Sequence, residues 1–306
     1  MPKDNLHYFE ISKDNPEPHL DESYFVIDNH PKLKEHIKAI KEIKEILITI
    51  KKLQENKEDI VVIEKYFKKL FEVFNSTYAN CSELGCFVNA CDTTRDLIQK
   101  DFNSFKEITK LYIKSRKIND KVPESWVQAI LDSNSSRKKG ELGERKLVKI
   151  LTEKGFIEVK SWEELHRKKK CVARFSREVF SNSSLKDNFG IKIKAKKQGK
   201  MLDLIIKDGK KIFLLEAKHL NVGGGEQDKQ VSELIEILNL KEGRNDFCYI
   251  SFLDGTYSNR LLGEIQKRSK KMLKQRKEIE KFLKNNKRNF WVNTAGFVEF
   301  VNDIKK

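Results

Sequence analysis

Residues 201–220, MLDLIIKDGKKIFLLEAKHL, decide which fold the sequence predicts. Two apolar runs flank Asp208-Gly209, a pair of residues typical of a two-residue β-hairpin turn. Both runs are apolar on each of their faces, as expected for strands of a sheet that helices cover on both sides. The second run nevertheless ends in Glu216 and Lys218, charges that buried strands seldom carry. The hairpin therefore predicts an α/β fold with a chemically unusual strand end.

The turn also determines which side chains share a face of the hairpin. With Asp208-Gly209 as the turn, Asp203 lies opposite Leu214 and diagonal to Glu216, about 7–8 Å away between backbones. Side chains alternate along a strand, so Asp203, Glu216 and Lys218 are expected on one face. Two interpretations stay open: the strand leaves the core and exposes its first charged residues, or the charges form a metal site.

Two carboxylates at the covered end of a hairpin repel each other and lose hydration, which is costly without a compensating cation. Mg²⁺ suits such a place because it binds one or two carboxylates and keeps several water molecules. Lys218, beside the carboxylates, would neutralise charge or polarise a water molecule. The pattern therefore favours a Mg²⁺ site formed by Asp203 and Glu216.

A third acidic residue stands in GELGERKLVKILTEKGF, residues 140–156, which predicts a helix. Glu144 precedes Leu147 and Val148 by three and four positions, so it belongs to the inward-facing stripe of that helix. Glutamate is also favoured in the first helical turn by the helix dipole, and Glu141 is expected to have that role alone. For Glu144 both interpretations stay open, a site residue or a favourable first-turn residue.

The remaining sequence predicts a helical first part and an α/β second part. Apolar residues at three-and-four spacing indicate the helices, and Asp92 is expected to cap the third one. The expected helices cover residues 33–53, 59–74, 92–115, 141–154, 226–240, 258–286 and 294–304, and the expected strands besides the hairpin cover 156–159, 247–253 and 289–293. The basic segment between residues 160 and 200 is expected to be irregular.

Alternation of helices and strands after residue 140 is typical of a mixed sheet. The predicted fold class is therefore α/β, with a mixed central sheet flanked by helices in residues 126–306. A helical N-terminal region, residues 1–125, precedes it, and the boundary is expected near Pro123.

Charge is distributed unevenly along this chain of 306 residues, whose formal net charge is +16. Residues 1–125 hold 21 Lys and Arg against 22 Asp and Glu, whereas residues 160–200 hold 13 against 4 and residues 261–289 hold 11 against 3. Two basic blocks in an otherwise nearly neutral chain predict a polyanionic partner, of which double-stranded DNA is the obvious one. An anionic membrane surface fits less well, because neither block has an apolar insertion face.

The basic block before the hairpin supplies candidate phosphate contacts, and its arginines are also suited to reading base edges. These candidates are Lys168, Lys169, Lys170, Arg174, Arg177, Lys194 and Lys196. The glycine-rich segment NVGGGEQDKQ, residues 221–230, precedes a predicted helix, so its backbone N–H groups near Gly224 would hold a DNA phosphate. Lys229 and Gln230 would face the same place, and a plain flexible loop is the alternative. His219 is interpreted as a structural or surface residue.

Cysteine spacing and hydropathy favour a soluble cytoplasmic protein. None of the five cysteines forms a C-x-x-C pair, which argues against a zinc site and against a disulfide framework. No run approaches ~18 apolar residues, and the N-terminus is polar where a secretory signal needs an apolar core. We therefore expect neither a membrane partner nor a small-molecule cofactor.

These motifs together resemble the PD-(D/E)xK nuclease superfamily, and most of all its type II restriction endonucleases. The resemblance covers residues 137–255. Leu202-Asp203 corresponds to the "PD" of the motif, without its proline, and Glu216-Ala217-Lys218 corresponds to "(D/E)xK". KGELGERKLVKILTEKGF, residues 139–156, resembles the first core helix of the superfamily.

The resemblance implies a restriction-endonuclease-like core that hydrolyses phosphodiester bonds of double-stranded DNA at a short specific sequence. Asp203 and Glu216 would bind Mg²⁺ with the Ala217 carbonyl as a further ligand, Lys218 would position or deprotonate the attacking water, and Glu144 would be an accessory metal or water contact. Symmetric cutting of both strands favours a homodimer, and the helical N-terminal region would supply specificity or dimer contacts. A structure-specific nuclease for junctions or repair is an alternative, as is a non-catalytic DNA-binding module with a degenerate nuclease fold.

Overall fold

The computed structural model describes residues 2–133, 136–194, 201–263 and 270–305. The chain forms two compact units: residues 1–25 with 137–306, here called the sheet unit, and residues 26–136, here called the helical unit. This division differs from the boundary expected between residues 125 and 126, because the first 25 residues pack within the sheet unit and residues 126–136 within the helical unit.

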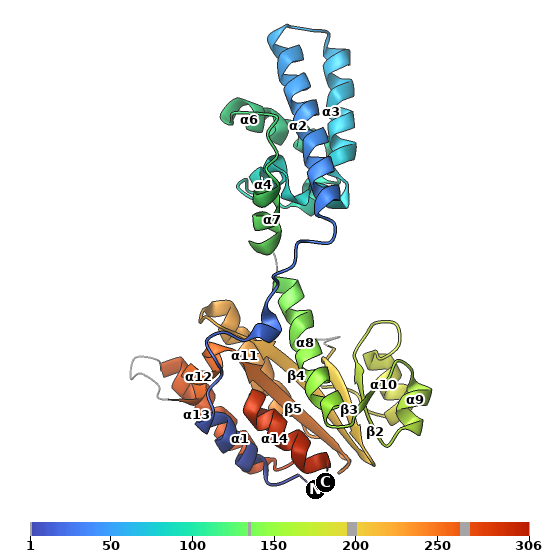
Figure 1. Ribbon diagram of the computed structural model, residues 1–306, viewed down its shortest axis with the longest axis vertical. Helices are drawn as coiled ribbons and strands as arrows, with labels where there is room; N and C mark the ends of the chain where they lie inside the picture. Colours follow the sequence, from blue (N-terminus) through green and yellow to red (C-terminus); the bar gives the residue numbers. More distant parts are fainter. Residues whose placement is uncertain (1, 134–135, 195–200, 264–269, 306) are drawn as a thin grey trace. The chain divides into compact units, whose positions relative to one another are not determined.

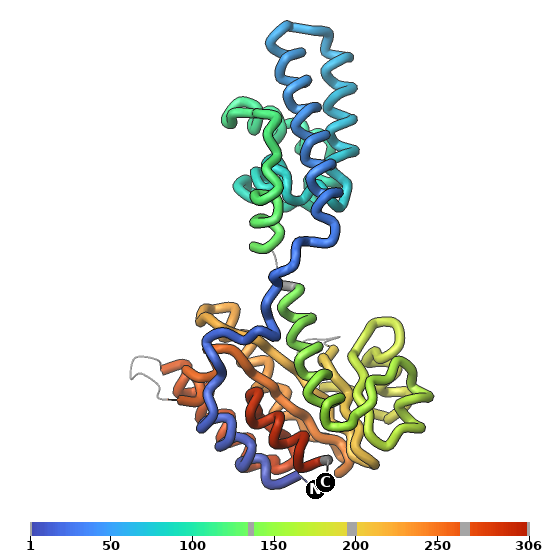
Figure 2. The backbone as a smooth tube through the Cα atoms, viewed as in Figure 1, coloured from blue at the N-terminus to red at the C-terminus, as the bar shows by residue number. Residues whose placement is uncertain are grey.

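The first residues join the sheet unit through helix α1 (Asn5–Asp14). The ring of Tyr8 packs edge-on against Phe290 and Phe300, with centroids 5.8 and 5.4 Å away. Its hydroxyl donates to Oδ2 of Asp303 at 3.0 Å, across 295 positions of the chain. Figure 2 shows the N-terminal helix, in blue, running beside the C-terminal helix, in red. Partners so distant in sequence leave no local pattern, which is why the sequence did not predict this packing.

The helical unit is built around an apolar core of its own. Its elements are α2 (Leu33–Glu55), α3 (Ile60–Phe74), the 3₁₀ helix η2 (Thr77–Cys81), α4 (Glu83–Val88), α5 (Arg95–Ile98), α6 (Phe102–Ser115) and α7 (Glu124–Ser133). The first two confirm the helices predicted there. The single helix expected from Asp92 onward is wrong, because Asp101 accepts hydrogen bonds from two backbone N–H groups and begins α6 as a new helix.

A six-stranded mixed sheet forms the centre of the sheet unit, as predicted (Figure 1). The strands are β1 (Ile157–Glu158), β2 (Lys170–Arg174), β3 (Leu204–Asp208), β4 (Lys211–His219), β5 (Phe247–Asp254) and β6 (Phe290–Val292), and they lie in this order. Strands β2, β3 and β4 pair antiparallel, and the other neighbouring pairs are parallel. Strand β2 was not predicted, since its KCVAR sequence lies inside the basic segment taken as irregular.

Helices cover both faces of this sheet. The unit contains η1 (Glu22–Tyr24), α8 (Ser136–Glu153), α9 (Trp162–Arg167), α10 (Asn182–Phe189), α11 (Gly225–Leu238), α12 (Thr256–Leu262), α13 (Lys270–Asn285) and α14 (Thr294–Lys305) besides α1. In Figure 1 α8 and α14 lie in front of the sheet and α11 lies behind it, in agreement with the apolar clusters that each helix joins. The single helix expected over residues 258–286 is wrong in its first part, because α12 ends at Leu262 and Gly263 is extended.

The hairpin keeps the predicted faces but has a different turn. Asp208 pairs with Lys211, so the two turn residues are Gly209 and Lys210. Gly209 has a φ of +60°, a conformation that glycine adopts at little cost and that a type II′ turn needs at its first central position. Leu204 pairs with Leu215, so Asp203 lies directly before the ladder and not opposite Leu214. A shift of two residues preserves the alternation, so Glu216 and Lys218 keep the strand face predicted for them.

Within the described residues, no helix has the combination of length and apolar character that a bilayer crossing requires.

Candidate metal centre

Asp203 and Glu216 meet at the end of the β3–β4 hairpin. The backbone N–H of Asp203 donates to the Leu215 carbonyl at 2.9 Å, and the Asp203 carbonyl accepts from the N–H of Phe175 at 3.0 Å. The N–H of Ala217 then donates to Oδ2 of Asp203 at 2.7 Å. In an extended strand the N–H and C=O of one residue point to the same side, so the Ala217 carbonyl also faces the Asp203 side of β4. Two carboxylates and one carbonyl therefore converge at this strand end.

Lys218 stands beside these oxygens on the same strand face as Glu216. Its Nζ lies 2.5 Å from Oε1 of Glu216, whose side chain is almost completely buried. Burial by itself would lower the pKa of Lys218, but the negative charges of Glu216 and Asp203 outweigh it and the pKa is raised. The ammonium group therefore stays charged at neutral pH and acts as a hydrogen-bond donor.

The two carboxylates carry more negative charge than their surroundings balance. Burial, and after it the charge of Glu216, raises the pKa of Asp203 to about 7, although Lys218 and the Ala217 N–H lower it. A divalent cation would relieve this repulsion and favour the ionised form. The donors are hard oxygens, namely two carboxylates and a backbone carbonyl, and this set fits Mg²⁺.

Glu144 approaches the centre from the other face of the sheet. Leu204 and Leu215 pack with Leu147 of α8, whereas Ile205 and Leu214, which alternate with them, pack on the α11 side. Glu216 and Lys218, which alternate with Leu215 along β4, therefore face α11, while Glu144 belongs to α8.

Glu144 nevertheless shares the electrostatic environment of the two carboxylates. Burial raises its pKa, the charges of Glu141 and Glu216 add to this, and Arg174 counteracts it. Among the described residues, however, it belongs to no set of three acidic or histidine side chains whose ligand atoms all lie within 4.8 Å. Such sets are His7 with Glu299 and Asp303, and Glu17 with Asp21 and Asp254. Glu144 is thus close enough for the charge of Glu216 to raise its pKa.

Three lysines proposed as phosphate contacts lie at the hairpin turn, away from this centre. Lys170 pairs with Asp208, and the carbonyl of Lys169 accepts from the N–H of Gly209, so both lie at the hairpin turn. Arg174 pairs with Leu204, next to Asp203, four residues or about 13 Å further along the strand. Antiparallel pairing thus separates Lys168, Lys169 and Lys170 from the carboxylates and brings Arg174 to them.

The structure describes the positions of most of the other proposed DNA contacts. Arg177, Lys194 and Lys229 are exposed, and Lys229 lies 3.6 Å from Glu226. Gly224 is the N-cap residue of α11 and Gln230 is half-buried in its second turn, so the phosphate cradle stays a prediction. Lys196 lies outside the described residues.

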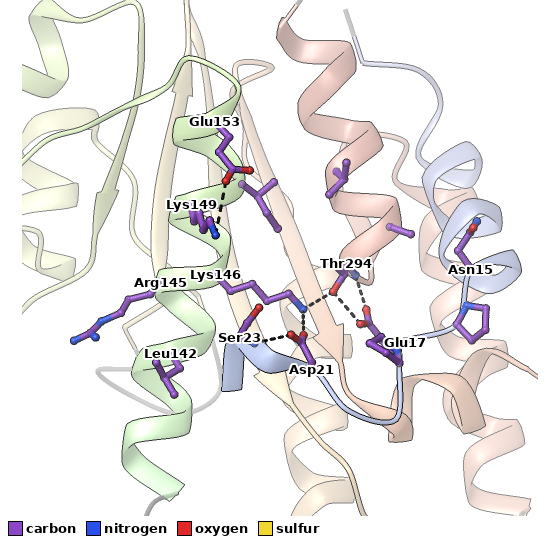
Figure 3. A pocket seen from close by; sticks show the side chains of 15 residues that line it. Asn15, Glu17, Asp21, Ser23, Leu142, Arg145, Lys146, Lys149, Glu153 and Thr294 are labelled. Carbon is purple, nitrogen blue, oxygen red and sulfur yellow. Dashed lines mark hydrogen bonds and ion pairs between the residues drawn. The ribbon is translucent and has the colours of Figure 1, made fainter. Parts of the chain in front are cut away.

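Sequence reasoning missed a buried polar network beside the centre. Asp254, at the end of β5, is fully buried and accepts hydrogen bonds from Tyr24 and Lys146. Figure 3 shows Lys146 reaching from α8 to Asp21 and Thr294, at 2.7 Å from each. The network borders a pocket of about 620 Å³ that does not include the metal-centre residues. A signal was present in Asp254-Gly255 at a strand end, but nothing in the sequence shows its partners.

Fold and site together define a mixed α/β protein with two carboxylates, a carbonyl and a lysine at the end of a central hairpin. Comparison of the chain with protein-family models, with curated proteins and with solved structures gave no match.

Proposed function

We propose that the protein is a Mg²⁺-dependent endonuclease that cleaves double-stranded DNA at a short specific sequence, in the manner of a type II restriction endonuclease. One observation carries this proposal: Asp203 and Glu216 meet at one hairpin end, where the Ala217 N–H donates to Asp203 and Lys218 is bonded to Glu216. Oxygen ligands with an adjacent ammonium group suit the activation of water against a phosphodiester.

Asp203, Glu216 and the Ala217 carbonyl would hold Mg²⁺. The bound ion would supply Lewis-acid stabilisation of the phosphate oxygens and a water of lowered pKa. Lys218 is charged at neutral pH, so it would donate a hydrogen bond to the attacking water or to a phosphate oxygen and thereby orient the two. In the reaction the water oxygen bonds to phosphorus as the bond from phosphorus to the leaving sugar oxygen breaks. The proton of the water passes to solvent, and the leaving sugar oxygen takes up a proton from solvent.

Charge supports DNA as the substrate. The chain carries a formal net charge of +16, and the segment that ends at the carboxylates contributes Arg174 and the exposed Arg177. Arginine is suited both to phosphates and to base edges. The helical unit would provide specificity or dimer contacts, and a homodimer would present two such centres to the two strands.

Supercoiled plasmid DNA with and without Mg²⁺ tests the proposal. Discrete, reproducible fragments that require Mg²⁺ are the expected result. Cleavage of branched DNA alone would replace the proposal by a structure-specific nuclease, and DNA binding without any cleavage would replace it by a binding module. Asp203→Asn protein, prepared in the same way, controls for a contaminating nuclease.

A further inference from the structure

Tyr24 is buried at the junction of three elements of the sheet unit. It ends η1, and its side chain is 5 % exposed. Its ring stacks on the imidazole of His219, with centroids 3.6 Å apart and planes 19° from parallel. Its hydroxyl donates to Oδ2 of Asp254 at 2.7 Å. Burial and the charge of Asp254 raise the pKa of Tyr24, so the hydroxyl keeps its proton.

Asp254 and Tyr24 together hold His219 from two directions. Nδ1 of His219 lies 2.8 Å from Oδ1 of Asp254, so the imidazole is fixed at its edge, while Tyr24 covers its face. The buried charge of Asp254 is compensated by Lys146, whose Nζ lies 2.8 Å from Oδ2. Removal of the Tyr24 ring would therefore uncover the face of His219, while Asp254 would keep its cationic partner Lys146.

The anchoring of His219 matters because the last residues of β4 pair with β5 and no longer with β3. The ladder between β3 and β4 ends at Leu204 and Leu215, whereas β4 continues along β5 to His219 opposite Asp254. Lys218 and the Ala217 carbonyl belong to this last stretch. A fixed imidazole at His219 thus fixes the backbone that carries Lys218, although the two side chains point to opposite faces.

The other edge of Tyr24 touches α8 one residue before Glu144. Gly143 is buried, and a Cβ atom at this position would lie 3.0 Å from the Tyr24 hydroxyl oxygen and 3.3 Å from Cε1. The absence of a side chain thus lets α8 close directly onto the tyrosine. Tyr24 therefore packs against the residue that follows Lys218 and against the residue that precedes Glu144.

We propose that Tyr24 is a positioning residue of the nuclease centre, which aligns Lys218 and the Ala217 carbonyl through its stack on His219 and aligns Glu144 through Gly143. This inference rests on the proposed function. It assigns a role in the reaction to the N-terminal segment, which the sequence had placed in a separate region. Positioning of this kind acts on the chemical step, because small displacements of groups around a reacting phosphate are costly.

Four variants test the role: Tyr24→Phe, Tyr24→Ala, His219→Ala and the double variant Tyr24→Ala/His219→Ala. Tyr8→Phe is the matched control, since Tyr8 is also buried in the N-terminal segment and also donates to an aspartate, Asp303. For each protein kcat and KM on plasmid DNA, Mn²⁺ affinity by calorimetry and the thermal unfolding midpoint are measured.

Tyr24→Ala and His219→Ala are each expected to lower kcat about 10-fold or more with KM unchanged, the usual cost of losing a partner behind the metal ligands. The double variant should be scarcely worse than either single one, because both changes break the same stack. Tyr24→Phe keeps the stack and should stay within about 3-fold of wild type, and Tyr8→Phe should equal wild type. Folded Tyr24→Ala protein with wild-type kcat, or additive losses in the double variant, would overturn the proposal.

Two further readouts keep the result interpretable. If Tyr24→Ala does not fold, Gly143→Ala displaces the tyrosine without removing it, and an unchanged kcat in that folded variant would equally overturn the proposal. If wild-type protein cleaves no DNA, the proposed function fails by itself, and Mn²⁺ affinity then decides the positioning role. Weaker Mn²⁺ binding by folded Tyr24→Ala protein, with normal binding by Tyr8→Phe, supports it, whereas equal affinities contradict it.

Discussion

The backbone N–H of Ala217 donates a 2.7 Å hydrogen bond to Oδ2 of Asp203, so the carboxylate of one strand takes the place of the missing ladder partner on the next. This bond directs the carboxylate of Asp203 toward β4 and toward the carbonyl of Ala217. The Asp203 carboxylate and the Ala217 carbonyl, which would bind a cation, are therefore held in place without one. As a consequence, the negative charge of Asp203 lies close to that of Glu216.

Asp203→Asn is expected to stabilise the protein without metal and to abolish both cleavage and stabilisation by Mg²⁺. The asparagine amide removes a negative charge that burial and the charge of Glu216 disfavour. The free energy of unfolding of the metal-free protein should therefore rise by on the order of 1 kcal/mol. Because the pKa of Asp203 is raised from 3.8 to about 7, the stability that its protonated form contributes is complete below pH 3.8 and is lost as pH rises through 7. The advantage of the variant should therefore grow between pH 4 and 7 in thermal unfolding experiments.

Asp208→Asn is the matched control for that experiment. It lies on the same strand, at the turn, 3.7 Å from Nζ of Lys170. Loss of the Asp208 carboxylate in this variant should change neither DNA cleavage nor the stabilisation by Mg²⁺. A metal-free Asp203→Asn protein that is less stable than wild type at pH 7 would show that the carboxylate is structurally required rather than electrostatically strained.

Lys218→Met is expected to abolish cleavage and to destabilise the protein by about 1–3 kcal/mol, because it leaves the buried carboxylate of Glu216 without its ammonium partner. The double variant Glu216→Gln/Lys218→Met should recover most of the stability and none of the activity. Urea unfolding of the two proteins separates the effects, with Lys211→Met at the start of β4 as control. Equal stability of single and double variants would mean that the ion pair does not compensate Glu216.

Glu144→Gln distinguishes a site residue from a favourable first-turn residue. Its raised pKa and the influence of Glu216 place its charge near the centre. We expect cleavage to fall about 10-fold, with a higher Mg²⁺ concentration needed, as when a group behind the metal ligands is lost. Glu141→Gln lacks this proximity to Glu216 and is the control. Coincident Mg²⁺ titrations of the two variants would remove Glu144 from the centre.

Alternation along strands explains why the candidate site was predictable and the register was not. The sequence placed the turn one residue too early at Asp208-Gly209, whereas Gly209-Lys210 form it, yet any shift by two residues leaves Asp203 and Glu216 on one face. Local patterns also predicted α2, α3 and the mixed sheet.

Local sequence patterns could not predict contacts between residues that are far apart in the chain. Tyr24 and Asp254 are 230 positions apart, and Lys146 and Asp21 are 125 apart. Each residue alone has an ordinary local environment, and only the folded chain brings the four together. The position of the lysine block was unpredictable for a related reason: it depends on β2 pairing antiparallel to β3, and no local pattern indicated β2.

That pairing leads to a last prediction, which separates the two ends of the basic segment. Arg174 lies at the carboxylate end, with its Nε 2.9 Å from Glu158, whereas Lys168 and Lys169 lie at the turn end. We expect a phosphate bound at the metal centre to reach this arginine, so Arg174→Gln should slow cleavage and reduce the slope of log Kobs against log salt by about 0.9, the value for one phosphate contact. The triple variant Lys168→Gln/Lys169→Gln/Lys170→Gln removes more charge but should leave both quantities unchanged, because those lysines lie about 13 Å further along the strand. DNA binding is measured with Asp203→Asn protein in Ca²⁺, so that no cleavage intervenes. A loss of slope near 2.7 in the triple variant would instead extend the bound duplex to the hairpin turn.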